Sequence, residues 1–258
     1  MSVFSKQFDS IVAADLQALV DNSVSETKTL EYKESLPGNS DGDKKEFLAD
    51  VSSFANASGG YSIFGMKENK GEASDLCGLS LSSADGEILR LEEIIRNGVA
   101  PRIPGTGIRG IPLRSSKFAI VLRIPRSWAL PHMVTFKNTS RFYSRNSAGK
   151  FQLDVDEIRA TFALSDTIRE RIQSFRTERL SSILAGEAPV LLPEGGKLIF
   201  HIVPFTAFDV AKIVDTSDLH DKAAKYEPLR SNGRNHRYNF DGFLTYSPYR
   251  DTGNTKSG

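Results

Sequence analysis

The chain has very little cysteine, and it has no apolar run long enough to cross a membrane. Cys77 is the single cysteine among 258 residues, which excludes an intramolecular disulfide and a zinc site made of several cysteines. The first residues lack the apolar core of a signal peptide. We therefore expect a reducing compartment, and we predict a cytoplasmic protein that does not associate with membranes.

Several familiar signatures are also missing from the sequence. It contains no internal repeat, low-complexity tract, Walker-type phosphate loop or nucleophile elbow. The pair Gly59-Gly60 is read more simply as the end of a helix than as a nucleotide motif. With 39% hydrophobic and 25% charged residues, the composition is typical of an ordinary folded protein. The length predicts one large domain, or one domain with an appendage.

Acidic residues are absent from a long central segment. Residues 94–153 contain eleven Lys or Arg but no Asp or Glu, whereas residues 1–93 carry 17 acids and 8 bases. Such a basic segment, with aromatic residues in it, suits a phosphate backbone, so nucleic acid is the expected polyanion. The alternative is that these bases pair with the acidic first third of the chain. We favour a polyanion, because internal pairing would not require that acids be excluded completely.

A short strand predicted at residues 29–33 places an acid beside a lysine. Leu30 and Tyr32 alternate with Glu31 and Lys33, as in a half-buried strand, so the two charged side chains project from one face. In metal-dependent nucleases such an acid holds a divalent cation, and such a lysine orients water or stabilises charge on the phosphate. The alternative is a solvated strand face with an ion pair.

An amphipathic helix and a second strand follow this first strand. The helix is predicted to begin at Asp43, its N-cap, and to stop at Gly59-Gly60. Residues 61–65 read as a buried strand, followed by a polar turn that contains Glu68. If the two strands are neighbours, Glu68 approaches Glu31.

Together these motifs resemble the Alba-like domain of the Schlafen family. The resemblance rests on Glu26-x4-Glu31-Tyr-Lys33, the run 51–65, Pro131-His132, the run 141–148 and the acid-rich helix from Asp154. It covers residues 26–164. It implies an α/β fold with a mixed sheet flanked by helices, here with a C-terminal helical and strand extension.

The resemblance also implies a catalytic site. In animal members this core cleaves transfer and ribosomal RNA with three carboxylates and a divalent metal. Glu26 and Glu31 match the family's two glutamates by position, and Glu68 is the best match for the third acid. The implied catalytic residues are these three, which would hold Mg²⁺ or Mn²⁺, together with Lys33. The leading interpretation is a metal-dependent endoribonuclease acting on tRNA or another structured RNA in bacterial defence against phage.

Two other interpretations stay open. Similar bacterial domains are fused to regulators and are thought only to bind DNA, so the alternative is a non-catalytic DNA- or RNA-binding module. The third is a protein-interaction scaffold, which the basic segment disfavours. RNA is the favoured partner and DNA the second. Because animal members have two such lobes, a homodimer of this chain could supply the second one.

Candidate contacts to nucleic acid lie within the basic segment. Residues 117–125 are predicted to form a central strand. Arg141, Tyr143 and Arg145 alternate on another strand, which suits a phosphate track with base stacking or, alternatively, a solvated face. For His132 a packed or substrate-contacting role is preferred to a metal ligand. The predicted nucleic-acid-binding set is Arg123, Arg126, His132, Lys137, Arg141, Tyr143 and Arg145.

The chain is predicted to divide into a domain at residues 1–164 and a helical connector with a small β extension at 165–258. Within the first part, residues 101–110 are predicted to be a surface loop. Around the boundary, two helices are expected, at 154–164 and from Ser165 to Gly186, the second a connector or a dimer-forming helix. A strand at 197–203 and a hairpin around Asp241-Gly242 are expected in the extension.

Overall fold

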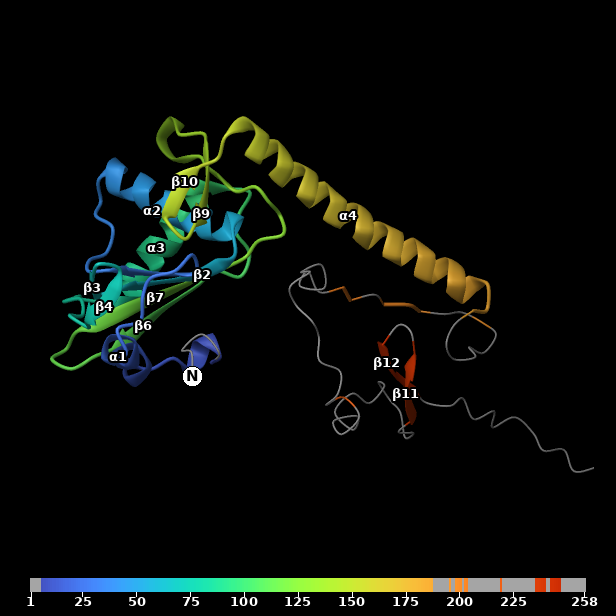
Figure 1. Cartoon of the computed structure of the whole chain (residues 1–258), viewed down its shortest axis with the longest axis horizontal. Helices are drawn as coiled ribbons and strands as arrows, with labels where there is room; N and C mark the ends of the chain where they lie inside the picture. The colour runs from blue at the N-terminus through green and yellow to red at the C-terminus, as the bar shows by residue number, and fades with distance from the viewer. Residues whose placement is uncertain are drawn as a thin grey trace, which may run out of the picture. The chain divides into compact units, whose positions relative to one another are not determined.

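The computed structural model describes residues 6–187, 195, 198–200, 202–203, 219, 235–239 and 242–246. The chain divides into two compact units, Met1–Thr167 and Ile168–Gly258 (Figure 1). None of the helices in the described residues is long and apolar enough to span a bilayer.

The core of the first unit is a four-stranded mixed sheet. Its strands are β1 (Leu30–Lys33), β2 (Gly59–Phe64), β7 (Phe118–Pro125) and β6 (Gly107–Pro112), in that spatial order. β1 and β2 are parallel and the other pairs are antiparallel. The parallel pair is joined through helix α2 (Asp41–Asn56), since parallel strands need a long crossover. The α/β class with a mixed sheet is confirmed, as is the central place of β7.

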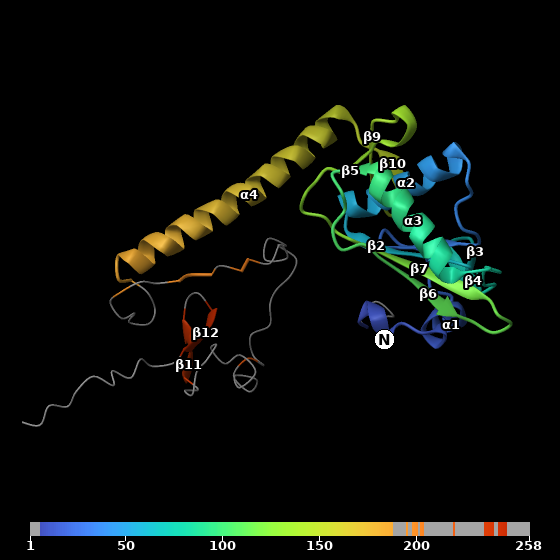
Figure 2. The ribbon, with the colours of Figure 1, turned by 180° about the vertical axis from the view of Figure 1, so that it is seen from behind.

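Helices cover both faces of this sheet (Figure 2). Alternate residues of β7 explain why, since Ala119 and Val121 join one buried cluster and Ile120, Leu122 and Ile124 join another. The first cluster includes residues of α1 (Ala13–Asp21), and the second includes residues of α2 and α3 (Ala84–Gly98). A strand that is apolar on both faces thus requires two helical layers.

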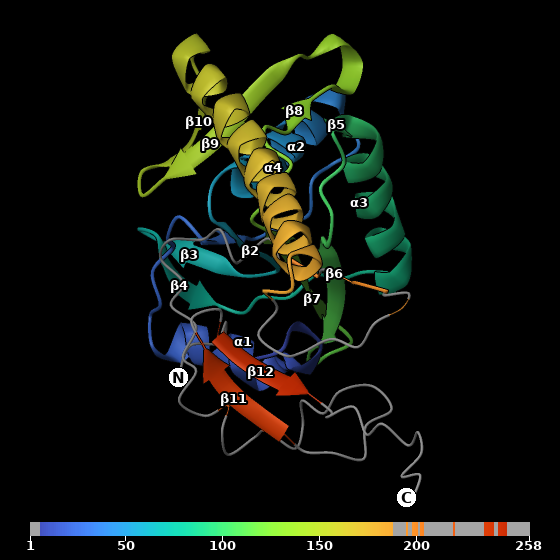
Figure 3. The same cartoon turned by 90° about the vertical axis from the view of Figure 1, so that its right-hand side faces the viewer.

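A second sheet packs on α2 (Figure 3). It is antiparallel, and its order is β10 (Gly149–Gln152), β9 (Arg141–Asn146), β8 (Met133–Val134) and β5 (Val99–Ala100). Every residue of α2 from Phe47 to Ala55 is buried. A helix buried on all sides lies inside the core, and here it lies between the two sheets.

The remaining elements are small or peripheral. The hairpin of β3 (Lys67–Asn69) and β4 (Glu72–Asp75) follows β2, and short 3-10 turns lie at Phe8–Ser10 and Phe136–Asn138. Helix α4 runs over Val155–Leu184. In the second unit, β11 (Asn235–Asn239) and β12 (Gly242–Tyr246) form an antiparallel pair, so the predicted hairpin is confirmed.

Two glycines are required where β2 begins. Gly59 has φ +69° and Gly60 φ +155°, a region in which side chains other than glycine's are strained. A Cβ on Gly59 would lie 2.3 Å from the backbone nitrogen of Arg126, and one on Gly60 would lie 2.4 Å from the carbonyl oxygen of Thr29. The pair therefore lets β2 enter tightly between β1 and β7, just after α2 has ended.

Two predicted helix boundaries are wrong. Ser40, not Asp43, caps α2, because its hydroxyl accepts a hydrogen bond from the Asp43 N–H at 3.1 Å. The predicted break before Ser165 is absent, and α4 continues through it. Ser165 is buried, with its hydroxyl 3.5 Å from the Trp128 carbonyl oxygen, so a polar residue at this point serves packing rather than a helix end.

Two further predictions are wrong in part. The surface loop expected at 101–110 overlaps β6, which begins at Gly107. Gly107 reads as a loop residue, yet a Cβ there would lie 2.7 Å from the Phe8 ring, so glycine serves close packing. Of the strand expected at 197–203, the described residues 198–200 and 202–203 have no regular secondary structure, and residues 197 and 201 lie outside the described part.

Candidate functional site

Strand β1 presents its charged side chains to the α2 side of the sheet. Leu30 and Tyr32 are buried in the cluster that includes α1, so Glu31 and Lys33 point the other way. This alternation was predicted and is confirmed. Since β1 is an edge strand, one side of the pair stays open to solvent, and Lys33 is 39% exposed.

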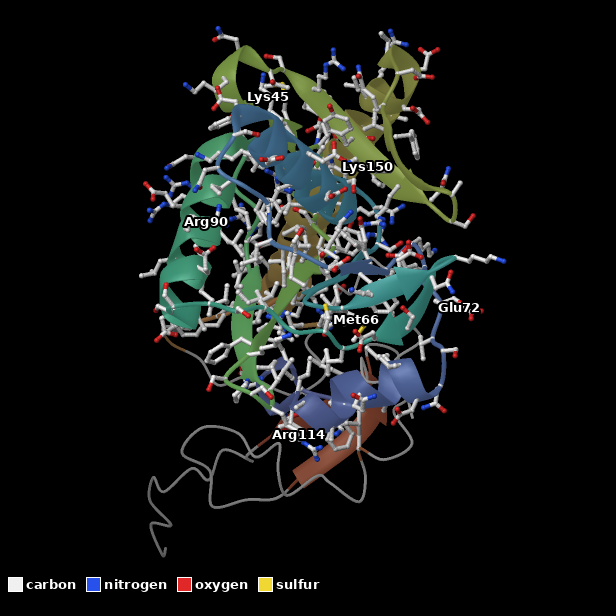
Figure 4. All side chains as sticks on the ribbon, turned by 90° about the vertical axis from the view of Figure 1, so that its left-hand side faces the viewer. Lys45, Met66, Glu72, Arg90, Arg114 and Lys150 are labelled. Atoms are coloured by element: carbon white, nitrogen blue, oxygen red, sulfur yellow. The ribbon has the colours of Figure 1, made fainter. Side chains whose placement is uncertain are left out.

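Five charged residues from β1, α2, β9 and β10 form what we call the acid–base cluster. Glu31 Oε1 lies 2.5 Å from Lys33 Nζ, and Glu31 Oε2 lies 2.9 Å from Arg145 Nη1. Lys33 Nζ lies 3.7 Å from Asp50 Oδ2, and Asp50 Oδ1 accepts from Lys150 Nζ at 2.7 Å. Lys150, labelled in Figure 4, reaches from β10 to α2. The cluster alternates in sign, so each carboxylate contacts cations.

Burial and charge act against each other within the acid–base cluster. Burial alone would raise the pKa of Glu31, but the hydrogen bond and charge of Lys33, together with those of Arg145, lower it overall. Burial and then the charge of Glu31 raise the pKa of Asp50, although Lys150 and Lys33 oppose this. For Lys33, burial would lower the pKa, but the charges of Asp50 and Glu31 raise it.

Arg145 belongs to the interior of this cluster. Its side chain is 5% exposed, and its guanidinium lies 3.6 Å from the centroid of the Phe54 ring. It therefore ties β9 to both β1 and α2. Its role in nucleic-acid binding stays a prediction, since in this arrangement its cation faces Glu31.

The other two predicted carboxylates lie near the start of β1. Glu26 precedes the strand, its Oε1 accepts from the Tyr32 N–H at 2.7 Å, and its own N–H donates to Gly71 O at 2.6 Å. Glu68, on β3, accepts from the Gly71 N–H. Burial, followed by the charges of Glu31 and Glu68, raises the pKa of Glu26. Glu26 thus lies close enough to both Glu31 and Glu68 for their charges to act on it.

A divalent cation would suit these three carboxylates chemically. Magnesium and manganese prefer oxygen ligands, and a bound cation would offset both the burial of Glu26 and the charges of Glu31 and Glu68, which raise the pKa of Glu26. As the side chains stand, no three His, Cys, Asp or Glu within the described part of the chain converge as a ready ligand group. Metal binding by Glu26, Glu31 and Glu68 therefore stays a prediction.

Asn56, at the end of α2, connects the loop before β8 with β9. Its amide nitrogen donates to the carbonyl oxygens of His132 at 2.9 Å and Tyr143 at 2.8 Å, and its oxygen accepts from the His132 N–H at 2.7 Å. His132 is fully buried, with Nδ1 2.7 Å from Pro101 O. Burial lowers its pKa. The packed interpretation of His132 is confirmed, and contact with nucleic acid would require this loop to move.

Sequence reasoning missed three important residues of this region. Asp50 is buried, and helical spacing could have indicated this, because it follows Phe47 by three positions and precedes Phe54 by four. Lys150 was seen only as part of the basic segment. For Asn56 the sequence holds no signal, because its partners are 76 and 87 residues away.

Aromatic and basic side chains, two of them exposed and three half-buried, lie beside the start of α4. The Arg126 guanidinium lies 4.3 Å from the Trp128 ring centroid, and Phe142 meets Phe162 edge-on at 6.2 Å. Phe162 is 48% exposed, and Arg141, next to Phe142, is exposed. We call these five residues the aromatic surface. It includes two members of the predicted nucleic-acid-binding set, Arg126 and Arg141.

The other predicted contacts are dispersed. Arg123 lies over the Phe8 ring at 4.8 Å, on the α1 side of the sheet, and Lys137 is exposed, 3.8 Å from Asp41. Tyr143 is half-buried against the cluster that contains α2. Part of the basic segment pairs with the acidic first third of the chain, because Lys137, Arg145 and Lys150 all contact acids there. The alternative interpretation of that segment is thus confirmed in part.

Comparison with known proteins identifies the family. The sequence profile described as Schlafen, AlbA_2 matches residues 26–154, which include the whole acid–base cluster. Among solved structures, the chain is similar to the crystal structure of the DIP2311 protein from Corynebacterium diphtheriae, with 13% identity and a TM-score of 0.38, over 55% of this chain and 30% of that one. No curated protein matches. With half of its residues matched, this chain belongs to the Schlafen, AlbA_2 family, whose membership indicates a nucleic-acid-related function.

Proposed function

We propose that the Met1–Thr167 unit binds nucleic acid, with RNA favoured, and that the aromatic surface is a principal contact. The observation that supports this most directly is that α4 contacts both aromatic pairs, Trp128 with Arg126 through Ser165 and Phe142 through Phe162. Bases stack on aromatic rings whatever their sequence, and neighbouring arginines neutralise the phosphates between them.

The two aromatic pairs lie on one side of α4. Ser165 contacts the Trp128 carbonyl oxygen at 3.5 Å, and Phe162 is three residues earlier on the same helix. Residues three apart in a helix share a face, so Trp128 and Phe142 are brought to neighbouring turns. The exposed Arg141, whose Nη1 donates to Gln152 at 3.0 Å, adds a cation beside them. Single-stranded or looped RNA, with its bases unstacked, suits such a surface best.

Fluorescence anisotropy of the full chain with labelled single-stranded RNA, single-stranded DNA and duplex DNA tests the proposal. The exposed Phe162 can be truncated without opening the core, so Phe162→Ala should weaken binding by about tenfold, the loss of about one stacked base. Leu89→Ala, an equally simple truncation of a 65% exposed side chain on α3, is the matched control and should bind normally.

The contribution of arginine to nucleic-acid affinity can be measured separately through its dependence on salt concentration. Arg141→Gln should reduce the slope of log affinity against log salt by about one, because one phosphate contact is lost. If Phe162→Ala and Arg141→Gln both bind like the unmodified chain, the aromatic surface is not the contact. If no nucleic acid binds at low salt, the proposed function itself is wrong.

Metal-dependent RNA cleavage is the second candidate, and the repulsion of Glu26 by both Glu31 and Glu68 supports it. A divalent cation held by these acids would stabilise the charge that develops on a phosphate. Lys33, which is 39% exposed and pairs with Glu31, would donate to a phosphate oxygen. Defence against phage would follow from such cleavage.

Incubation of tRNA and single-stranded DNA with the full chain in Mg²⁺ or Mn²⁺ separates cleavage from binding. Cleavage should stop on chelation and in Glu31→Gln, which keeps the shape of the side chain. Glu72→Gln, an exposed acid on β4, is the control and should cleave normally. Binding without cleavage under all these conditions would leave a nucleic-acid-binding module only.

A further inference from the structure

A cavity of about 640 Å³ lies on the α1 side of the sheet. The proposed function does not involve this cavity. We propose that it binds a small molecule that carries a phosphate or a similar anionic group. The cavity volume is within the usual range for small-molecule sites, about 300–1,000 Å³. Its walls come from α1, the segment after β4 and the β6–β7 turn, and its lining includes Ala13, Gln17, Leu76, Cys77, Arg114 and Lys117.

The charges of this cavity select an anion. Arg114 and Lys117 line it, and none of the described residues that line it is an Asp or Glu. Two smaller cavities differ in this respect. The one of about 210 Å³ beside Lys33 also contains three acids. The one of about 310 Å³ beside α3 contains two acids with two arginines. The α1 cavity therefore differs from these two cavities because no acid among its described lining residues offsets its two cations.

The β6–β7 turn positions both cations. Arg114 and Lys117 flank Ser115 and Ser116, which have φ +59° and +54°, the tight conformation of a two-residue hairpin turn. Lys117 Nζ donates to the Cys77 carbonyl oxygen at 2.8 Å, which holds the ammonium at the cavity wall. An ammonium has three N–H donors, so two remain for a ligand.

The rest of the wall suggests what the anion is attached to. Leu76 and Leu113 give an apolar surface, while Gln17 and Ser115 supply neutral hydrogen-bonding groups. Mixed walls of this kind suit an organic body that carries one charged group. A phosphate ester of about the size of a nucleoside monophosphate fits this description better than a bare ion does.

Cys77 provides a specific test, because it is the single thiol of the chain and lines the cavity. Its alkylation by iodoacetamide at mildly alkaline pH can be followed by mass spectrometry of the full chain. Adenosine 5′-monophosphate at four times its dissociation constant should slow the reaction about fivefold, since only free protein reacts. Inorganic phosphate should protect at higher concentration, and adenosine should not protect.

Substitution of a cavity arginine tests whether its positive charge contributes to ligand binding. Arg114→Gln should raise the dissociation constant for adenosine 5′-monophosphate, obtained from the protection curve, by about tenfold. Arg102→Gln, which changes an exposed arginine outside this cavity, should leave it unchanged. Thermal unfolding of both variants checks that they are folded. Protection by phosphate alone would identify a free anion as the ligand and still support the site.

Three results would overturn the proposal. They are equal protection by adenosine, no protection by either phosphate compound at millimolar concentration, and protection that Arg114→Gln leaves intact. Protection by an oligonucleotide but by neither small phosphate compound would assign the cavity to nucleic-acid binding instead.

Discussion

At the scale of single residues, Asn56 joins two backbone segments that lie 76 and 87 residues away in the sequence. Its amide makes three hydrogen bonds of 2.7–2.9 Å to the backbone of His132 and Tyr143. Asn56→Ala removes all three and leaves their backbone partners unsatisfied. We expect the free energy of unfolding to fall by about 2–4 kcal/mol, measured by urea denaturation.

Ser58→Ala is the matched control for this prediction. Ser58 lies two residues later and is exposed, so its truncation should change the free energy of unfolding by less than about 0.5 kcal/mol. Equal stability of the Asn56→Ala and Ser58→Ala variants would show that the amide does not join the loop before β8 to β9.

The neutral, buried His132 should make stability depend on pH. Its folded pKa is lowered by burial, whereas in the unfolded chain it titrates near 6.5. Below about pH 6.5 the unfolded state therefore binds more protons, and the free energy of unfolding should fall by up to about 1.4 kcal/mol per pH unit until the folded pKa is reached.

The contribution of His132 is isolated by comparing pH profiles. Urea denaturation at pH 7.5, 6.5 and 5.5 should show that the free energy of unfolding falls more steeply with decreasing pH for the unmodified chain than for His132→Gln. This holds whatever the difference in stability between the two proteins at pH 7.5. Glu26, with its raised pKa, acts in the opposite direction but is present in both proteins. Parallel profiles would contradict the assignment.

At the scale of elements, α2 is the piece around which the first unit is built. It is buried from Phe47 to Ala55, and the two sheets cover its opposite sides. Its polar residues therefore act inward, Asp50 toward the acid–base cluster and Asn56 toward β9. Arg145 of β9 contacts Glu31 of the first sheet, and Lys150 of β10 contacts Asp50 of the helix itself.

Arg145 tests how β9 is joined to β1. Arg145→Met keeps much of the contact with the Phe54 ring but leaves the Glu31 carboxylate buried with one cation fewer. We expect a loss of about 3–5 kcal/mol in the free energy of unfolding, because the remaining charge is poorly compensated. Arg141→Met, on the exposed end of the same strand, should lose less than about 0.5 kcal/mol.

The pH dependence of this difference gives a second check. The folded pKa of Glu31 is lowered, so its ionised form stabilises the protein above the unfolded pKa, and that stabilisation is lost as the pH falls through the folded value. The deficit of Arg145→Met should therefore shrink in acid. A deficit that stays constant to pH 3 would indicate lost packing rather than a lost ion pair.

At the scale of the whole molecule, α4 bears several large apolar side chains that are substantially exposed. Leu180 is 42% and Leu184 76% exposed. We predict that these side chains support the homodimer that the resemblance implied, since such residues on a long helix commonly mark an interface. Light scattering of the full chain should give about twice 28.4 kDa.

A paired substitution tests this interface. Leu180→Lys with Leu184→Lys should shift the mass toward that of one chain, whereas Arg171→Ala with Glu178→Ala, on the same helix, should leave it unchanged. A single-chain mass for the unmodified protein at micromolar concentration would show that the exposed residues of α4 do not pair two copies.

Local patterns were enough to predict β1, α2, β2 and β7 of the first unit. Alternation at Leu30–Lys33 and the apolar run of β7 gave strands that the structure confirms, because burial of alternate side chains is a property of the segment itself. Boundaries were less accurate. Ser40 displaced Asp43 as the cap, since both residue types can accept a helical N–H and only the path of the chain selects one.

The sequence alone determined that Glu31 and Lys33 share a strand face and that the basic segment is free of acids, because both are properties of residue order. Only the tertiary structure decided what those charges contact. Arg145 and Lys150 follow Glu31 and Asp50 by 114 and 100 residues, so their pairing depends on how β9 and β10 fold over α2. The same folding placed Lys137, Arg145 and Lys150 beside acids and left Arg141 exposed next to Phe142, which no periodicity in the chain could specify.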